Sequence, residues 1–326
     1  MFTGMSRHNI LAVGAILAAV APATIAAPTF PDKPIRFIVP FGPGGPGDAI
    51  GRMLGKKLSE SLGQSVVVDN RSGATTVIGT QIAAESPPDG HTLLLISTTH
   101  AVNPSLFKKL PYDPVKDFAP VTLVTSTPFM LVVHPSVTAN TVTELIALAR
   151  GRPGQLNYGS SGNGSSIHLT TELLRNVAKI EMTHVPYKGS GPAFIDLIGG
   201  QVQMLFSSTV SSLPHVKSGK VRGLAITSLR RAASLPTIPT IAESYPGFES
   251  SSWFGLLVPA TTPKPVIDRL LAESRSALLS PEVNQMLVSQ GAEPGGSSPA
   301  EFAAYFQSEI RKWRRVIEAA AIKLEQ

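Results

Sequence analysis

The feature that most constrains this chain of 326 residues is a regular alternation of short apolar runs and longer amphipathic segments. The first apolar run, residues 35–39, has the length of a strand. Residues 49–62 place Ile50, Leu54 and Leu58 on one helical face, and Gly63 marks the end of that helix. Strands that alternate with helices favour parallel sheets covered by helices. The pattern therefore predicts an α/β fold.

The same alternation continues along the chain. It predicts further strands at 66–68, 93–96, 121–124, 129–133, 156–158, 182–185, 202–206, 221–227 and 253–258. It predicts further helices at 77–85, 142–150, 167–177, 192–198, 211–218, 265–279, 281–290 and 299–323. Thr141 and Glu144 have the spacing of a capping box at the start of one helix. A chain longer than one average domain favours two lobes.

A glycine-rich loop, FGPGGPGD, follows the first strand at 41–48. With Asp69 after the next strand, Gly42, Gly44 and Gly47 match the G-x-G-x-x-G fingerprint of dinucleotide-binding proteins. Prolines in the loop, however, remove N–H groups on which phosphate binding depends. Asp48, at the expected N-cap, would repel a pyrophosphate. A dinucleotide oxidoreductase is therefore the weaker interpretation, and Asp48 is expected to cap its helix or to accept from a ligand.

A second strand–loop–helix unit carries the loop GSSGNGSS at 159–166. Serine hydroxyls, backbone N–H groups and the start of a helix together suit a carboxylate. The alternative is an ordinary serine-rich capping turn. His168 follows in the first helical turn, where packing or capping is the expected role. Since ligands of α/β proteins lie at the carboxyl ends of strands, the two loops predict a cleft between lobes.

The N-terminal segment, residues 1–27, has the features of a cleaved signal peptide. Arg7 and His8 precede an uncharged apolar run at 10–20, and small residues follow up to Ala27. The run is too short to span a bilayer comfortably. The mature protein is therefore expected in the periplasm. Because the chain has no cysteine, disulfides, thiolate metal sites and thiol catalysis are excluded.

Charge and motif content argue against several classes of protein. The net charge is +6, yet no long run of Lys or Arg is present, so nucleic-acid binding is not expected. The histidines form no metal-binding motif, and we expect no metal and no cofactor. Ser105 and Lys108 match the S-x-x-K motif of exported acyl-serine hydrolases, but the companion S-D-N and K-T-G motifs are missing. This hydrolase remains the alternative. Trp253 and Trp313 are expected in the core.

Six segments of the chain together have the pattern of one known family. They are PDKPIRFIVPFGPGGPGD (31–48), VVVDNRSGATTVIGTQIAAESPPDGHTLL (66–94), LNYGSSGNGSSIHLTTELL (156–174), VPYKGSGPAFIDLIGGQV (185–202), LPHVKSGKVRGLAITS (213–228) and WFGLLVPATTPKPVIDRL (253–270). With these segments the chain resembles the Bug family of periplasmic solute-binding receptors, the TctC-like receptors of tripartite tricarboxylate transport systems. The resemblance covers essentially the whole mature chain.

The resemblance implies a two-lobed, type II-like periplasmic binding protein with a ligand cleft between parallel-rich α/β lobes. The first lobe would comprise 28–127 and 253–326, and the second 128–252. Such receptors capture small organic carboxylates for membrane transporter subunits or for sensing, and they are not enzymes. We expect a monomer. Gln203 and the Ser207–Thr209 segment depart from an acidic residue and an Asp/Asn-containing segment of many relatives, which leaves the ligand's identity open.

The predicted site combines both loops with residues near other strand ends. Backbone N–H groups and serine hydroxyls would hold the carboxylate, while aromatic rings would form apolar walls. Hinge closure would follow from contacts made only when both lobes reach the ligand. The predicted ligand-binding residues are Phe41, Gly42, Gly44, Gly45, Asp48, Ser97, Thr98, Asn103, Ser160, Ser161, Gly164, Ser165, Tyr187, Ser207 and Ser208.

Overall fold

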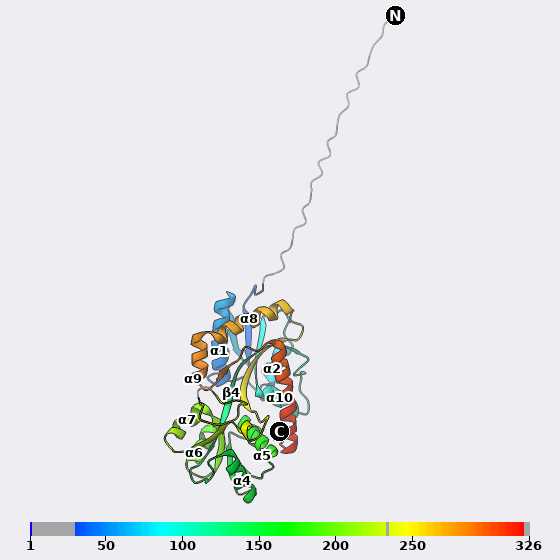
Figure 1. Ribbon diagram of the computed structural model, residues 1–326. Helices are drawn as coiled ribbons and strands as arrows, with labels where there is room; N and C mark the ends of the chain where they lie inside the picture. The colour runs from blue at the N-terminus through cyan, green and yellow to red at the C-terminus, as the bar shows by residue number, and fades with distance from the viewer. Residues whose placement is uncertain (2–29, 233–234, 323–326) are drawn as a thin grey trace.

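The computed structural model describes Met1 and residues 30–232 and 235–322 (Figure 1). Residues 2–29, which hold nearly all of the predicted signal peptide, lie outside the described residues. Within the described part of the chain, no helix is long and apolar enough to cross a membrane.

Strands and helices alternate as the apolar pattern predicts. The strands are β1 (Ile35–Val39), β2 (Val66–Asn70), β3 (Thr92–Ser97), β4 (Phe118–Val133), β5 (Asn157–Ser160), β6 (Thr183–Pro186), β7 (Met204–Ser208), β8 (Arg222–Ile226), β9 (Ser251–Pro259) and β10 (Glu293–Pro294). The helices are α1 (Pro46–Leu62), α2 (Val77–Ala84), α3 (Thr98–Leu106), α4 (Val142–Gly151), α5 (Ser166–Ala178), α6 (Ser190–Ile198), α7 (Thr209–Lys217), η1 (Ile241–Glu243), α8 (Lys264–Leu279), α9 (Pro281–Ser289) and α10 (Pro299–Ala319).

The strands form two regions that share β4. The order is β2-β1-β3-β9-β4-β7-β5-β6, and β8 and β10 also pair with β4. In one outer region, β1 pairs in parallel with β2 and with β3. In the other, β5 pairs in parallel with β6 and with β7. The crossing strands β4 and β9 are antiparallel to each other and to their neighbours. Figure 1 shows α1, α8 and α9 at one end and α4 to α7 at the other, with α10 along one side.

β4 is longer than the sequence pattern predicts. Two strands were expected at 121–124 and 129–133, and the structure instead has one strand of 16 residues. Ser126, Thr127 and Pro128 look like a turn in sequence, but they stay extended because they pair with β9. Beyond them, β4 changes partners to β7 and β8. The strand therefore crosses from one lobe to the other without a break.

The structure also differs from expectation at the starts of α1, α3 and α4, in position, existence and capping respectively. α1 begins at Pro46 with Gly45 as its N-cap, so Asp48 occupies the third helical position, N3, and not the N-cap. α3 was not expected, and it contains Pro104 in its interior. At α4, the Thr141 hydroxyl accepts from the Glu144 N–H as predicted. The Glu144 carboxylate, however, accepts from the N–H of Asn140 at 2.7 Å, one residue before the expected position.

The core covers both faces of the sheet. The apolar face of α1 is buried, as its spacing predicts, and Gly63 ends the helix in the left-handed conformation. Each fully buried leucine of this face contributes about 1.5–3 kcal/mol. Trp253 and Trp313 are both 0% exposed, which confirms their prediction as core residues. Packing of α10 against α3 and α5 links the two ends of the molecule.

Candidate ligand-binding site

A cavity of about 270 Å³ lies where the first turns of α3 and α5 meet. One wall comes from α3 and the turn before α2, and the other from α5 and its preceding loop. None of the lining residues has an ionisable side chain. The lining residues are Thr75, Thr98, Thr99, Val102, Leu106, Asn163, Gly164, Ser165, Ser166 and Leu169.

The α3 wall is held by hydrogen bonds to its surroundings. Ser97 is the N-cap of α3, and its hydroxyl accepts from the N–H of Thr99 at 3.2 Å. The hydroxyl of Thr98 donates to the carbonyl of Ser251 and accepts from the N–H of Trp253, both at 3.3 Å. Both partners belong to the crossing strand β9. The cavity wall is therefore fixed directly to the strand that joins the lobes.

The turn before α2 has an unusual backbone. Ala74, Thr75 and Thr76 have φ angles of 43°, 53° and 74°, so three consecutive non-glycine residues are left-handed. Each such residue is sterically unfavourable, and strain of this kind is often stored at functional sites. The fully buried Asn103 holds the turn by donating from Nδ2 to the carbonyl of Thr75 at 2.9 Å. Asn103 thus supports the cavity from behind.

The α5 wall contains the predicted serine loop. Ser165 is the N-cap of α5, and its hydroxyl accepts from the N–H of His168 at 3.3 Å. The Nδ1 atom of His168 accepts from the N–H of Gly164 at 3.0 Å. Ser160 is fully buried and lies 2.6 Å from Nε2 of His184. His168 thus has the capping role expected of it. The Ser160 hydroxyl contacts His184 and accepts from the N–H of Gly162 in the same loop.

The first glycine-rich loop does not line this cavity. The Asp48 carboxylate accepts from the N–H of Gly44 at 2.9 Å, from Arg52 at 3.0 Å and from Asn70 at 3.0 Å. Hydrogen bonds from Arg52, and then from Gly44 and Asn70, lower the pKa of Asp48 to about 2. Asp48 therefore organises its own loop. Phe41 packs edge-on against Phe254 of β9, with ring centroids 5.8 Å apart.

The remaining predicted residues also lie elsewhere in this structure. The hydroxyl of Tyr187 donates to Asp196 at 2.7 Å, and burial followed by the Asp196 charge raises the pKa of Tyr187 to about 12. Ser208 is the N-cap of α7, accepting from the N–H of Ser211 at 3.2 Å. Of the fifteen predicted residues, those in the cavity are Thr98, Gly164 and Ser165. Those outside it are Phe41, Gly42, Gly44, Gly45, Asp48, Ser97, Asn103, Ser160, Ser161, Tyr187, Ser207 and Ser208.

Sequence reasoning did not select seven of the lining residues. Asn163 and Ser166 lie in the serine loop, where the loop itself was the available signal. Thr75 lies in a glycine-containing turn whose left-handed run has no sequence signature. The other four lie on α3, which was not predicted, or deeper in α5: Thr99, Val102, Leu106 and Leu169.

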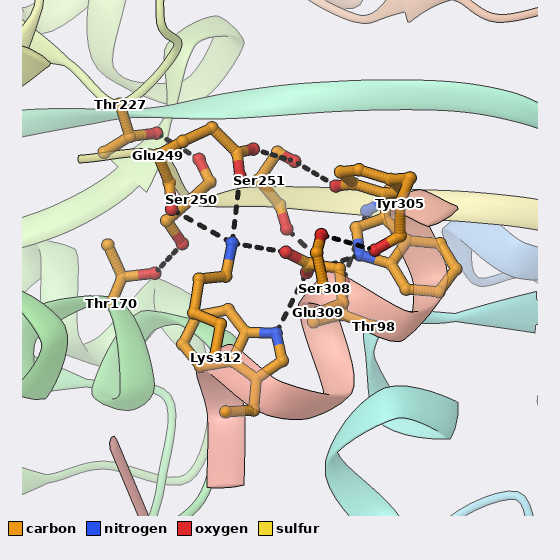
Figure 2. Close-up of polar contacts among 12 residues, drawn as sticks. Thr98, Thr170, Thr227, Glu249, Ser250, Ser251, Tyr305, Ser308, Glu309 and Lys312 are labelled. Atoms are coloured by element: carbon orange, nitrogen blue, oxygen red, sulfur yellow. Dashed lines mark hydrogen bonds and ion pairs between the residues drawn. The ribbon is translucent and has the colours of Figure 1, made fainter. Parts of the chain in front are cut away.

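A buried ionic cluster lies beside the crossing strands (Figure 2). The ammonium of Lys312 contacts the Glu309 carboxylate and lies 2.9 Å from the carboxylate of Glu249. The indole N–H groups of Trp253 and Trp313 both donate to Oε2 of Glu309, at 2.8 and 3.0 Å. The cluster forms part of the wall of a second, larger cavity of about 970 Å³. It ties α10 to the residues that precede β9.

The geometry does not support the two alternative functions. The Oγ atom of Ser105 is buried without a hydrogen-bond partner, so Lys108 does not activate it. The carboxylate of Asp69, which a dinucleotide would need for its ribose, pairs with Arg36 at 2.6 Å and with Arg71 at 2.8 Å. Neither catalytic nor cofactor chemistry is assembled at these residues.

Two regions joined by crossing strands, with an uncharged cavity between them, define the class of two-lobed solute-binding proteins. A family model described as the tripartite tricarboxylate transporter family receptor matches residues 50–322. The chain belongs to this family, whose receptors are periplasmic, and it is a solute-binding receptor and not an enzyme. The family resemblance seen in the sequence is thereby confirmed.

Individual relatives agree with the family assignment. The chain is 40% identical over 328 residues to the protein BugT of Bordetella pertussis (strain Tohama I), covering 98% of this chain and 100% of BugT. The structure of R. palustris Rpa4515 with adipate has 38% identity and a TM-score of 0.73, over 90% of this chain and 99% of that chain. A TctC solute-binding protein from Polaromonas without ligand has 26% identity and a TM-score of 0.81, over 89% and 100%.

Proposed function

We propose that this receptor is a periplasmic monomer that captures a small organic carboxylate between its lobes. It would pass the ligand to membrane subunits of a tripartite tricarboxylate-type transporter or to a sensing system. The first lobe would comprise 28–127 and 253–326, and the second 128–252. The export step would depend on the signal peptide at 1–27.

The observation that carries this proposal is the uncharged cavity between two helix starts. The first turns of α3 and α5 both line it. The free N–H groups of a helix start favour an anion, and each hydrogen bond to a charged oxygen contributes about 1.5–3 kcal/mol. The cavity volume of about 270 Å³ is near the lower end for ligand pockets, which suits a small acid. Val102, Leu106 and Leu169 would contact its carbon chain.

A similar receptor supports the ligand class. Rpa4515 was solved with adipate, a dicarboxylate with an apolar middle. An acid of this shape would place one carboxylate at the helix starts and its carbon chain on the leucines. We therefore infer that adipate and its shorter and longer analogues are the first ligands to test.

We also infer that the structure represents the open receptor. It overlays better on the Polaromonas protein without ligand, at a TM-score of 0.81, than on the adipate complex, at 0.73. The identities, 26% and 38%, would favour the opposite order. A difference in the angle between the lobes would account for this result. Closure would then bring Gly42, Gly44 and Gly45 of the first loop toward the cavity.

Thermal-shift measurements test the proposed function. The panel comprises adipate, succinate, citrate, glutamate, nicotinate, muconate and benzoate, with NAD and a β-lactam as controls. A ligand at about 100 times its dissociation constant adds roughly 2.7 kcal/mol, which raises the melting temperature by a few degrees. Ser165→Ala should reduce the shift caused by the best acid. If no acid stabilises the protein and NAD or the β-lactam does, the proposal is wrong.

A further inference from the structure

The two glycine-rich loops share one hydrogen-bond pattern that differs in a single group. In each loop a left-handed glycine precedes the N-cap: Gly44 with φ 81° before α1, and Gly164 with φ 72° before α5. In each case its N–H donates to the side chain at N3 of the helix. The acceptor is the carboxylate of Asp48 in α1 and the imidazole of His168 in α5.

Two described helices, α3 and α5, have a histidine at N3; of these, His168 accepts from a backbone N–H, whereas Nδ1 of His100 has no partner. Four other helix starts use a carboxylate at N3 to accept from a backbone N–H at or next to the N-cap. These carboxylates belong to Asp48, Glu144, Glu243 and Glu301. The helix that uses a neutral acceptor is α5, whose start lines the ligand cavity. A carboxylate at this position would repel an anionic ligand, whereas a neutral imidazole holds the loop without adding negative charge.

The hydrogen bond defines the protonation state of His168. A backbone N–H is always a donor, so Nδ1 must be unprotonated and the proton of the neutral ring sits on Nε2. A doubly protonated ring would place an N–H against the N–H of Gly164. That hydrogen bond would then be lost, and Gly164 would have to move.

Charged and titratable groups from each neighbouring element face this ring. The imidazole of His184 on β6 stacks on it with centroids 3.9 Å apart and an interplanar angle of 7°. Tyr158 on β5 stacks on both imidazoles. Glu172 of α5 lies 3.8 Å from Nε2, but its carboxylate is already bound by Tyr158 and by Arg175. Glu172 therefore opposes the effect of burial on His168, while Arg175 partly offsets the carboxylate.

These surroundings favour the neutral ring. Burial, and then the positive charge of Arg175, lower the pKa of His168 despite the opposing effect of Glu172. Burial, followed by the charges of His168 and Arg175, lowers the pKa of His184 to about 4. Both imidazoles are therefore neutral at neutral pH. His168 therefore becomes protonated at a pH below the usual histidine pKa of about 6.5.

We propose that His168 is a positioning residue: its neutral imidazole fixes Gly164 and the carboxylate-binding loop, and protonation of the ring releases that loop. The inference rests on the proposed function, because the loop is taken to hold the ligand. Acid lowers ligand affinity in any case, because it protonates the carboxylates of the ligand. Protonation of His168 should lower the affinity further. Loss of one such hydrogen bond corresponds to about a fivefold loss of affinity.

Calorimetric titration with adipate at about pH 7.5 and about pH 5 tests the proposal by comparing variants. Glutamine at N3 can accept from the same N–H but does not titrate. His168→Gln should therefore bind like the wild type at the higher pH and lose less affinity in acid, by about fivefold once NMR shows the wild-type His168 ring to be protonated. Protonation of adipate is common to both proteins and cancels in their ratio. His168→Leu, which lacks an acceptor, should bind weakly at both pH values.

His134→Gln is the matched control. Its Nδ1 also accepts from a backbone N–H, that of Ser136 at 3.2 Å, but it does not line the cavity. This variant should keep the wild-type pH profile. If His168→Gln keeps the wild-type profile down to a pH at which NMR shows the wild-type His168 ring to be protonated, the proposal is wrong.

A second measurement does not depend on any ligand. In amide NMR spectra, the Gly164 signal should shift with the same midpoint as the His168 ring, and this shift should disappear in His168→Gln. A Gly164 amide that stays unchanged while the ring titrates would overturn the positioning role. If no acid binds at neutral pH but Gly164 follows His168, the ligand class has failed and the coupling of ring and loop still stands.

Discussion

Replacement of Lys312 by methionine should destabilise the receptor far more than loss of an exposed lysine. The side chain of Lys312 is 16% exposed, and that of its partner Glu309 is 1% exposed. Methionine fills a similar volume but leaves the carboxylates of Glu309 and Glu249 without their cation. Breaking a buried ion pair in this way costs about 3–5 kcal/mol.

The loss of stability in Lys312→Met should also depend on pH. Burial raises the pKa of Glu309 in the folded protein, while Lys312 opposes that effect. Without Lys312, the folded state binds a proton to Glu309 at a pH where the unfolded state does not. The variant should therefore regain stability as pH falls, by up to about 1.4 kcal/mol per pH unit.

Urea unfolding followed by circular dichroism, at about pH 7.5 and about pH 5, measures both effects. Lys264→Met is the matched control, because Lys264 and Asp268 are 82% and 53% exposed and such pairs contribute about 0–1 kcal/mol. In the Lys312→Met background, Glu309→Gln should recover part of the loss, since an amide oxygen still accepts from both indoles. Equal losses for the two lysine variants, or no recovery in the double variant, would refute this reasoning.

Three further predictions concern packing, capping and acid stability. Gly255→Ala should cost about 1–3 kcal/mol in urea unfolding, because the added Cβ would lie 2.0 Å from the Phe302 ring. Gly151→Ala, with open space at its Cβ, should change stability by less than about 0.5 kcal/mol. Ser165→Ala should cost about 1 kcal/mol through loss of the α5 N-cap. Asp48, with its pKa lowered to about 2, contributes stability present above about pH 4 and lost in stronger acid, so Asp48→Asn should flatten that part of the acid-unfolding profile.

Each of these has an outcome that would contradict it. Equal stabilities of the two glycine variants would mean that the Phe302 ring can move aside without cost. An unchanged Ser165→Ala protein would mean that water replaces the hydroxyl at the helix start. An acid profile of Asp48→Asn identical to that of the wild type would mean that the loop is held without this carboxylate.

Most of the fold could be predicted from the sequence, because it follows from local apolar periodicity. That Leu54 and Leu58 share one face of α1 follows from their spacing within one helix, and this face is the one that the structure buries. The failures are long-range. Residues 126–128 have the composition of a turn but stay extended, because β9 pairs with them. Helix α3 was not expected, and its packing against α10 joins segments that are far apart in the sequence.

The site was less predictable than the fold. Gly164 and Ser165, which line the cavity, were selected because a serine-rich loop before a helix is a local pattern with a local consequence. Thr75 was missed because its left-handed conformation depends on Asn103, a residue distant in sequence. Whether Gly44 reaches the ligand depends on the angle between the lobes, which no local pattern encodes.

The chain contains only two tryptophans, and both indole N–H groups donate to the carboxylate of Glu309. Trp253 lies in the crossing strand β9 and Trp313 in α10, and neither lines the proposed ligand cavity. Under the proposed closure, their fluorescence emission would respond to movement of these two elements without direct quenching by a bound acid. A change in emission on addition of a ligand would report the rearrangement of the lobes without any attached dye.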